Sequence, residues 1–445
     1  MSLAGYGARM PTVADAPRVL LVYADRVGTS MGGVGIRAVE LARVLRDELG
    51  ARVTIAAAET DGGDVGVPVV EFAPHAPRAL DPLLARTDAV IAQPGWPALM
   101  RRLSRSGARL IFDLYDPEAF GTLEHFAGRD RRLRALMGAF AVDRLTDALR
   151  RGHHVMCASE RQRDLWLGAL LGCGLVTPER YDADPGLRSF LDVVPYGVPS
   201  IPPAAETEPP RARLGIAADE RLILWNGGIW SWLDAPTAIR AVGLLRERGA
   251  PVRLVFMGAS SAAPAIRATE QARALAAELG LLGGGVIFHE GWVPYAERAD
   301  WLLDADCAIS THVEHLETRF ASRTRLLDCF WAGLPAVCTA GDELAARVQR
   351  EDLGAVVPPE DPLATADALA RVLDRGRAAY ADALAAAAAD LAWSRVAAPL
   401  LRWLRDPPAA SPARRPFDRR LSERLRSGVY LAAAPARLRP PRLKR

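Results

Sequence analysis

The chain has 445 residues, half of them hydrophobic and 24% charged, with a formal net charge of +3. This length predicts two or three domains, and this composition is typical of a soluble globular protein. No apolar run reaches the roughly 18–20 residues that a membrane-spanning helix needs, and the first residues lack the charged start and apolar core of a secretory signal. We therefore expect a cytoplasmic protein.

Two residue types narrow the chemistry further. The five cysteines show neither C-x-x-C pairs nor zinc spacing, so we expect reduced thiols and no metal site. The single lysine, Lys444, is the next-to-last residue. A Schiff base to pyridoxal phosphate is therefore excluded, because that chemistry needs a buried lysine.

The first half of the chain alternates strand and helix patterns. Residues 18–25 form an unbroken apolar run typical of a buried parallel strand, and a helix pattern over 36–49 follows a glycine-rich stretch. Further strands are predicted at 52–58, 89–93, 109–115 and 154–159. The alternation predicts a doubly wound α/β domain, which we place at residues 1–197.

The second half repeats this alternation after a proline-rich stretch, residues 192–210, that we interpret as the interdomain linker. A second α/β domain is predicted at 198–389, a C-terminal helix that packs back toward the first domain at 390–410, and a tail at 411–445. The strands of the second domain are predicted at 221–228, 252–258, 285–291, 307–311 and 336–340, with helices at 235–249 and, rich in alanine and at the surface, 381–393. Two doubly wound sheets place a cleft at the carboxyl ends of their strands.

The glycine-rich stretch GTSMGGVGIR (28–37) lies between the first strand and the first helix. Glycines there let the backbone approach a ligand, and a helix N-terminus offers free N–H groups to an anion. We predict an acceptor or phosphate loop made by Gly32, Gly33, Gly35 and Arg37. The spacing is not G-x-G-x-x-G, so a dinucleotide cofactor is not expected. The alternative is a tight turn that binds nothing.

Four motifs follow one another between residues 291 and 339: GWVP (291–294), HLETRFASRT (315–324), the acid Asp328, and AGLP (332–335). In this order they resemble the retaining nucleotide-sugar glycosyltransferases of the family four type, also called group 1, which have the GT-B fold. The GGVG loop and the stretches IFDLYDP (111–117), VPYGVP (194–199) and DLAWSRVAAPLLRWL (390–404) fit the same layout. The resemblance covers about residues 18–405 and implies two Rossmann-like domains facing each other across a cleft.

The resemblance implies a nucleotide-sugar donor in the C-terminal domain. A helix starting near Ser322 or Thr324 would present backbone donors to a pyrophosphate, and the arginines at 319, 323 and 325 could pair with its oxygens. Asp328 stands where the family's second glutamate holds the ribose. The predicted donor-binding residues are Gly228, Trp292, Val293, Glu317, Arg319, Ser322, Arg323, Thr324 and Asp328. The alternative is a solvated basic turn with Asp328 at the surface.

The sequence departs from the family in three places. The family's first acid lies eight positions before the second, where this chain has Phe320, so that Glu317 is the nearest replacement. The family places an arginine and a lysine after the first strand of the second domain, where this chain has Gly228 and Leu233. Trp230 and Trp232 could line the pocket, although tryptophans more often serve packing.

The predicted catalytic residues are Asp116 and Arg323. Asp116 lies in LYDP (114–117), where related enzymes carry a His-Asp pair facing the acceptor, and it could orient the acceptor hydroxyl or help to remove its proton. The alternative is that Asp116 only begins a turn before Pro117.

The function implied by the resemblance is sugar transfer from a nucleoside-diphosphate sugar to a hydroxyl of a glycan or lipid-linked acceptor, as in polysaccharide, glycolipid or cell-envelope synthesis. Retention at the anomeric carbon is expected, with no cofactor and no metal, because the nucleotide sugar is a co-substrate and arginines can replace a cation. The alternatives are an inactive glycosyltransferase-like binding or scaffold subunit, motivated by Gly228 and Leu233, and a GT-B sugar-nucleotide epimerase.

The tail carries the positive charge of the chain. Residues 411–445 hold 11 basic and 2 acidic side chains, a net +9, so the chain's +3 leaves −6 for residues 1–410. A body of that charge is not expected to bind nucleic acid. Apolar residues recur every four positions in the tail, which predicts an amphipathic helix on an anionic membrane at the inner face of the plasma membrane. The stripe is Phe417, Leu421, Leu425 and Val429. The alternative is a solubilising extension.

Overall fold

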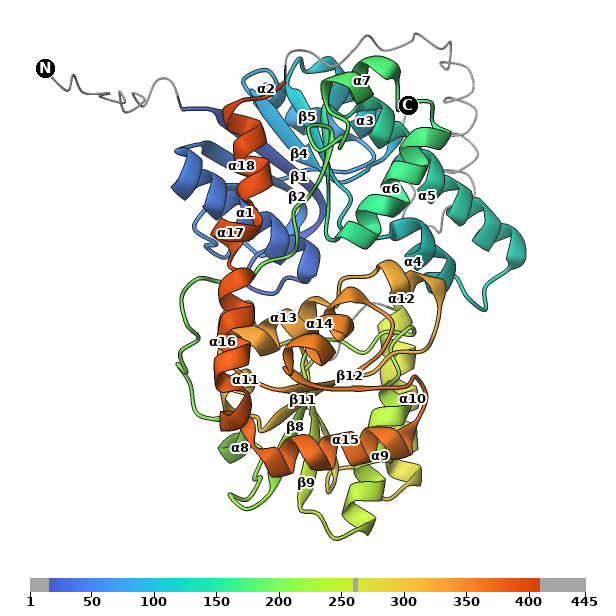
Figure 1. Cartoon of the computed structure of the whole chain (residues 1–445), viewed down its shortest axis with the longest axis vertical. Helices are drawn as coiled ribbons and strands as arrows, with labels where there is room; N and C mark the ends of the chain where they lie inside the picture. The colour runs from blue at the N-terminus through green and yellow to red at the C-terminus, as the bar shows by residue number, and fades with distance from the viewer. Residues whose placement is uncertain (1–15, 259–262, 409–445) are drawn as a thin grey trace, which may run out of the picture.

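The computed structural model describes residues 16–258 and 263–408, which fold into two α/β domains placed one above the other (Figure 1). The basic tail, for which a membrane contact is predicted, lies outside the described residues. Each domain is built on one parallel sheet whose inner strands are buried apolar runs, as a sheet covered by helices on both faces requires. The expected fold class, two Rossmann-like domains facing each other, is confirmed.

The N-terminal sheet has seven parallel strands in the order β3-β2-β1-β4-β5-β6-β7. Its strands are β1 (Arg18–Val27), β2 (Arg52–Thr60), β3 (Val69–Glu71), β4 (Ala89–Ala92), β5 (Arg109–Asp113), β6 (His154–Cys157) and β7 (Leu191–Val193). Its helices are α1 (Gly33–Leu49), the 3-10 turn Pro77–Leu80, α2 (Asp81–Leu84), α3 (Pro97–Arg105), α4 (Glu118–His125), α5 (Arg131–Arg151), α6 (Glu160–Gly172) and α7 (Pro178–Ala183). The strand order reverses between β1 and β4, and such switch points are where open α/β sheets bind ligands.

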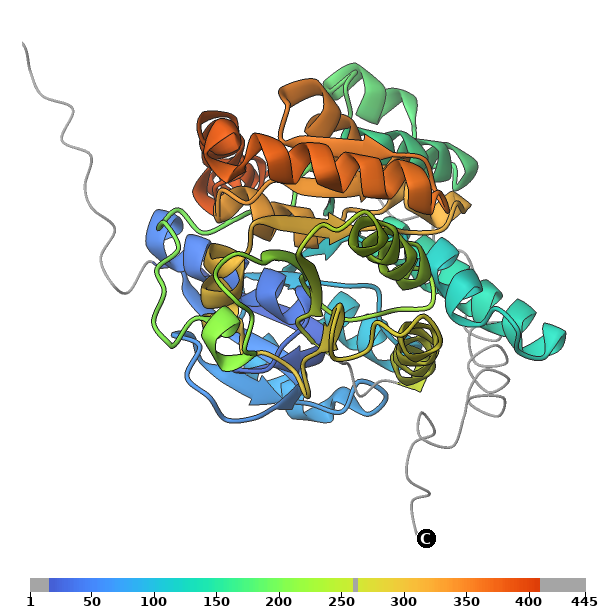
Figure 2. The same ribbon diagram turned by 90° about the horizontal axis from the view of Figure 1, so that it is seen from below.

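The C-terminal sheet has six parallel strands in the order β10-β9-β8-β11-β12-β13, with its switch point between β8 and β11. Its strands are β8 (Arg221–Trp225), β9 (Val252–Phe256), β10 (Val286–Phe288), β11 (Cys307–Ser310), β12 (Ala336–Thr339) and β13 (Gly354–Val357). Its helices are α8 (Pro210–Arg213), α9 (Ala235–Glu247), α10 (Ala263–Glu278), α11 (Arg298–Asp304), α12 (Leu316–Phe320), α13 (Thr324–Trp331), α14 (Glu343–Glu351), α15 (Pro362–Arg375) and α16 (Ala381–Asp390). Helix α15 packs beside α9, as the view from below shows (Figure 2). Within the ranges described, no helix is both long and apolar enough to cross a membrane.

Three strands of the structure were not predicted. β3, β7 and β13 have only three or four residues each and lie at or next to the ends of the sheets. The last two residues of β7 fall inside the stretch 192–210 that we interpreted as linker, so the linker begins after Val193. The alanine-rich stretch forms α16, and Leu384 and Ala387 of this helix are buried. The helix therefore buries one face, on the side where it packs with α13.

The chain crosses between the domains twice, and the two crossings are bonded together. The Val198 amide donates to the Leu391 carbonyl (2.8 Å), and the Trp393 amide donates to the Val198 carbonyl (3.0 Å). A Cβ atom on Gly197 would lie 2.6 Å from the Trp393 ring, so only glycine allows this approach. After the second crossing, α17 (Trp393–Val396) and α18 (Ala398–Arg405) pack on α1 of the N-terminal domain (Figure 1).

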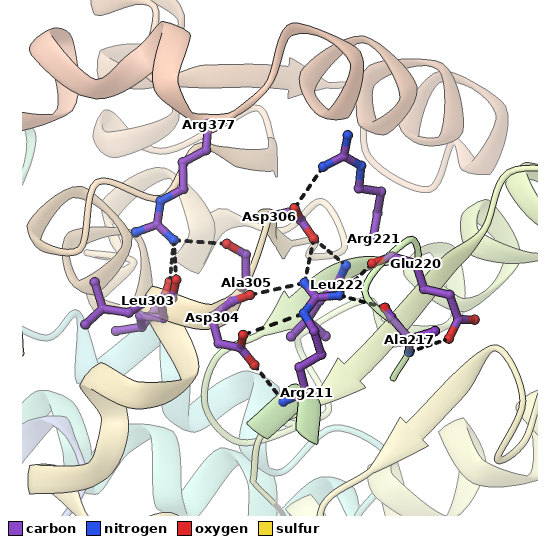
Figure 3. Close-up of polar contacts among 11 residues, drawn as sticks. Arg211, Ala217, Glu220, Arg221, Leu222, Leu303, Asp304, Ala305, Asp306 and Arg377 are labelled. Carbon is purple, nitrogen blue, oxygen red and sulfur yellow. Dashed lines mark hydrogen bonds and ion pairs between the residues drawn. The ribbon is translucent and has the colours of Figure 1, made fainter. Parts of the chain in front are cut away.

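A polar cluster below the C-terminal sheet anchors the linker (Figure 3). Arg211 of α8 donates to the Glu220 carbonyl (2.6 Å) and to the Asp306 carboxylate (2.9 Å). The same carboxylate accepts the Leu222 amide at the start of β8 (2.7 Å). Arg377 donates to carbonyls at the end of α11, including that of Leu303 (2.9 Å). These contacts fix the sheet at its amino edge and leave the carboxyl edge facing the other domain.

Candidate functional site

A cavity of about 200 Å³ lies between the carboxyl edges of the two sheets, with walls from both domains. We call it the interdomain cavity. The N-terminal domain contributes the start of α1 with Gly32 and Gly33, together with Tyr196. The C-terminal domain contributes the loop after β8, including Asn226, Gly227 and Gly228, the turn with Trp292 and Val293, Tyr295, Arg298 of α11, and Thr324, Arg325 and Asp328 of α13. The cavity is thus where the topology predicts a ligand.

Two helix N-termini face each other across the interdomain cavity. A Cβ atom on Gly33 would lie 3.8 Å from the hydroxyl oxygen of Thr324, the first residue of α13. The first residues of a helix have backbone N–H groups without partners inside the helix, so its N-terminus attracts anions. Gly227, which has a φ of 109°, turns the chain beside the cavity and has no side chain that could fill it. The backbone at the cavity therefore favours a negatively charged ligand.

The predicted glycine-rich loop divides into two parts. Gly32 and Gly33 line the interdomain cavity, whereas a Cβ atom on Gly35 would meet the Arg26 carbonyl at 2.4 Å, so Gly35 lets α1 approach the end of β1. Arg37 is fully buried and forms a bidentate ion pair with Asp113 (2.7 and 2.9 Å). It also donates to the carbonyls of residues 194 and 195 (both 2.9 Å). Arg37 is thus turned into the domain and does not face the cavity, which corrects its expected place in a phosphate loop.

The surroundings of Arg37 stabilise its positively charged form. Burial alone would lower the pKa of Arg37, but the adjacent Asp113 carboxylate raises it above its usual value. The Tyr23 hydroxyl donates to the same carboxylate (2.7 Å). Buried ion pairs persist when both partners are hydrogen-bonded in this way.

Arg325 lies against the loop after β8. Its Nη2 donates to the Gly228 carbonyl (3.1 Å), and its guanidinium carbon lies 5.2 Å from the centre of the Trp225 ring. Its Nη1 is buried and has no partner in the described structure. Burial, helped by the charge of Arg323, lowers the pKa of Arg325 to about 10. The sequence pattern put this arginine near a phosphate but did not single it out.

Arg298 is a cavity residue that the sequence analysis missed. It donates to the Tyr295 carbonyl (2.8 Å) and to Asp328 (3.3 Å). Its guanidinium carbon lies 3.6 Å from the Tyr295 ring centre and 4.5 Å from that of Trp331. Its Nη2 is buried and unpartnered among the described residues. The only signal in the sequence that could have indicated this role is that Arg298 follows the aromatic residue Tyr295 by three positions.

Asp328 and Trp292, two of the predicted donor-binding residues, both line the interdomain cavity. The Asp328 side chain keeps 32% of its surface exposed, and burial raises its pKa although Arg298 opposes the rise. Trp292 is 36% exposed and covers Gly258, while Val293 is buried beside it. Trp230 also lines the cavity and stacks on Trp232, with ring centres 5.2 Å apart.

The arginines at 319, 323 and 325 do not gather at one spot, contrary to expectation. Arg323 is 7% exposed and donates to Thr318 (3.0 Å) and Glu317 (3.4 Å). Arg319 lines a second cavity, on the side of α6. Only Arg325 lines the interdomain cavity. Arg319 belongs to α12, Arg323 precedes α13 and Arg325 lies within α13, so the three side chains extend from different elements and diverge in space.

Ser322 lies between these groups, and its carbonyl accepts the Thr324 amide (2.9 Å) at the start of α13. Ser322 does not line the interdomain cavity, although it lies two residues before Thr324, which does. Its contact with the donor stays a prediction. The helix itself begins at Thr324, as predicted.

Asp116 lies in a separate cavity of about 260 Å³ at the carboxyl edge of the N-terminal sheet, shared with Asp25 and Glu118. Its side chain is exposed and lines this cavity. Desolvation by the cavity walls raises the pKa of Asp116 to about 6, with a further contribution from the negative charge of Glu317. Arg323 opposes the rise. The predicted acceptor-side acid and the predicted catalytic arginine thus interact electrostatically across the domain boundary.

Metal-ligating side chains do not cluster in the described structure: residues 16–258 and 263–408 contain no group of three or more His, Cys, Asp or Glu that could hold a metal ion. The charged cavity-lining groups are Arg298, Arg325 and Asp328. This set suits an anion and not a cation.

Comparisons with known proteins find a family match within the second domain. Residues 220–375 match the protein family described as Glycosyl transferases group 1. The chain is 31% identical over 246 residues to a D-inositol 3-phosphate glycosyltransferase of Xylanimonas cellulosilytica, covering 51% of this chain and 55% of that protein. It is 30% identical over 220 residues to a protein of the same name from a Nocardioides species, covering 48% and 46%. The chain thus spans about half the length of the curated relatives it matches.

Solved structures show the likeness of the whole fold. HepE of Anabaena, determined in complex with UDP-glucose, aligns with a TM-score of 0.63 at 16% identity, covering 87% of this chain and 99% of that one. Sucrose-phosphate synthase from Thermosynechococcus elongatus aligns with a TM-score of 0.59 at 17% identity, covering 87% and 98%. The expected GT-B fold is therefore confirmed, and the resemblance to group 1 glycosyltransferases is confirmed by the match over residues 220–375.

Proposed function

We propose, from the group 1 glycosyl transferase domain at residues 220–375 and the GT-B fold of the chain, that the protein transfers a sugar from a nucleoside-diphosphate sugar to a hydroxyl acceptor. The donor would bind in the interdomain cavity. The observation that carries this proposal is the composition of that cavity: two helix N-termini, two arginines, one aspartate and an exposed tryptophan, contributed by both domains. These groups match the diphosphate, ribose and base of a nucleotide.

The domains have separate roles in this proposal. Asp328 accepts hydrogen bonds from the ribose hydroxyls, and Trp292 with Val293 holds the base. The helix N-termini and arginines stabilise the charge that develops on the departing diphosphate. Closure of the two domains excludes water, so that the sugar passes to the acceptor and not to solvent. We infer retention at the anomeric carbon, with an oxygen of the departing phosphate taking the acceptor proton.

The acceptor would bind on the N-terminal side, at the cavity that contains Asp116. A carboxylate there accepts a hydrogen bond from the acceptor hydroxyl and orients it toward the donor. We propose a glycan or lipid-linked acceptor, and a cytoplasmic enzyme held at the inner membrane face by the +9 charge of residues 411–445. Flotation with anionic vesicles at low salt tests this: the full chain should float and a chain ending at Pro408 should not. Equal behaviour of both would remove the membrane from the proposal.

Turnover tests the function directly. The protein is incubated with UDP-, GDP-, ADP- and dTDP-sugars, and release of the nucleoside diphosphate is followed with and without excess EDTA. We expect hydrolysis or transfer with at least one donor, unchanged by EDTA, because arginines and helix dipoles replace a divalent cation. Binding without turnover, in every combination, would instead identify an inactive binding subunit. Loss of activity in EDTA, restored by magnesium or manganese, would contradict metal independence.

A further inference from the structure

Arg325 is a partly buried cation without a carboxylate partner in the described structure. Its guanidinium group makes one hydrogen bond, to the Gly228 carbonyl, and keeps Nη1 unpartnered. A charged nitrogen that is withdrawn from water without a partner is costly to the folded state. A charged group in this state that also lines a cavity is a candidate for ligand binding. Arg325 therefore marks a place for an anion.

The backbone that carries Arg325 is held firmly. The Asn226 side chain donates to the Arg325 carbonyl (2.7 Å), and the Cys329 thiol donates to the same carbonyl (3.2 Å). The first bond joins the first turn of α13 to the end of β8, and the second lies within α13. The backbone of Arg325 is thus held in place in the first turn of α13, an eight-residue helix, and the guanidinium group extends from there.

Arg298 provides a second unpartnered nitrogen. Its side chain is 9% exposed, clamped between the Tyr295 and Trp331 rings, and bonded to Asp328. The Arg298–Asp328 pair is neutral in sum, so the charge of the cavity's lining residues is +1 and is supplied by Arg325. A diphosphate brings the negative charge that this lining lacks.

We infer that Arg325 and Arg298 form the diphosphate receptor of the interdomain cavity, with Arg325 supplying the net charge and Arg298 a positioned second donor. This inference rests on the proposed function and deepens it. Arg319 and Arg323 take no part, because neither lines the interdomain cavity. Arg319 lines another cavity, and Arg323 donates to Glu317 and Thr318. The receptor discriminates nucleoside diphosphates from nucleosides, since a nucleoside has no group that could pair with a guanidinium.

Titration calorimetry with three probes tests the receptor: UDP, uridine and inorganic pyrophosphate, with GDP and ADP run beside UDP. For Arg325→Gln we expect the affinity for UDP to fall roughly 10- to 100-fold, as for loss of a charged hydrogen bond. Binding of pyrophosphate should be lost, and the affinity for uridine should not change. Arg298→Gln should weaken UDP binding less, and Arg325→Lys, which keeps the charge, should retain part of it.

Arg377 is the matched control. It is another arginine of the C-terminal domain whose pKa is lowered by burial, but its nitrogens donate to backbone carbonyls such as those of Gly333 (2.9 Å) and Ala305 (3.0 Å). Arg377→Gln should bind UDP as the wild type does. Affinity for UDP that is equal in Arg325→Gln and wild type would overturn the receptor and leave the proposed function standing. Pyrophosphate binding through Arg325 without binding of any nucleotide would keep the receptor and overturn the donor assignment, and a wild type that binds no probe would overturn both.

Discussion

Each domain has an arginine near the carboxyl edge of its sheet, and the hydrogen bonds of the two side chains differ sharply. Arg37 of the N-terminal domain has no exposed surface and is bonded to Asp113 and to two carbonyls. Arg325 of the C-terminal domain has one carbonyl contact and an unpartnered nitrogen. The pKa shifts agree, since that of Arg37 rises and that of Arg325 falls to about 10. The number of satisfied donors therefore separates these two arginines, one fully bonded within its domain and the other with a nitrogen left for a ligand.

The largest expected effect is a loss of stability when the buried Arg37–Asp113 ion pair is broken. Asp113→Ala leaves the Arg37 charge buried and unpaired, so the free energy of unfolding should fall by about 3–5 kcal/mol, measured by urea denaturation. Asp47→Ala is the control, because Asp47 pairs with Arg46 at the surface, where their side chains are 57% and 47% exposed. This control should change stability by less than about 1 kcal/mol. Equal losses in the two variants would show that the buried pair is not special.

Asp116, in the cavity proposed for the acceptor, gives a prediction for the pH dependence of kcat/KM. Because its carboxyl pKa is raised to about 6, the group is ionised only above that pH. If Asp116 acts as a carboxylate, kcat/KM should fall about tenfold for each pH unit below 6. Asp116→Asn should lower kcat/KM by about 100-fold, or about 2.7 kcal/mol, and abolish this acid limb.

The control for Asp116 is Asp130→Asn, which changes an acid whose side chain caps α5 away from both cavities, to a residue that also caps helices. The control should keep the wild-type pH profile. An acid limb that persists in Asp116→Asn would assign that pKa to another group and reduce Asp116 to a turn residue.

Arg377 is an arginine of the C-terminal domain whose nitrogens donate to backbone carbonyls, as Arg37 does in the N-terminal domain. Arg377→Gln removes charged hydrogen bonds to carbonyls around α11 and the end of α13, so the free energy of unfolding should fall by about 1.5–3 kcal/mol. Urea denaturation measures this loss. A variant as stable as the wild type would mean that the carbonyls find other partners, and that counting satisfied donors does not identify structural arginines.

Much of the fold followed from the sequence, because long buried strands are unbroken apolar runs such as residues 18–25. The short strands β3, β7 and β13 could not be predicted from three or four residues, since their pairing depends on neighbours distant in the chain. β7 in addition stands at the edge of a proline-rich stretch that resembles a linker.

The site was predictable as a region but not residue by residue. The order of motifs located the turn at Trp292 and the helix at Thr324, and both line the interdomain cavity. Which of the arginines near 323 faces that cavity depends on the rotation of α13, and sequence spacing cannot fix it over so short a segment. Arg298 was missed because its partner Asp328 lies thirty residues away. Arg37 was misplaced because nothing in the sequence shows that Asp113 lies beside it.

The central claim is that Arg325 lowers the stability of the free protein in order to bind a diphosphate. Because its folded pKa of about 10 lies below the unfolded value, this destabilisation is fully present at any pH below about 10. The direct measurement is the Tm of wild type and Arg325→Gln at pH 7.5, without and with saturating UDP. Without UDP the variant should melt roughly 2–4 °C higher, and with UDP the order should reverse, because only the wild type is stabilised strongly by the ligand. A variant that melts lower than the wild type without UDP, and rises equally with it, would contradict the account.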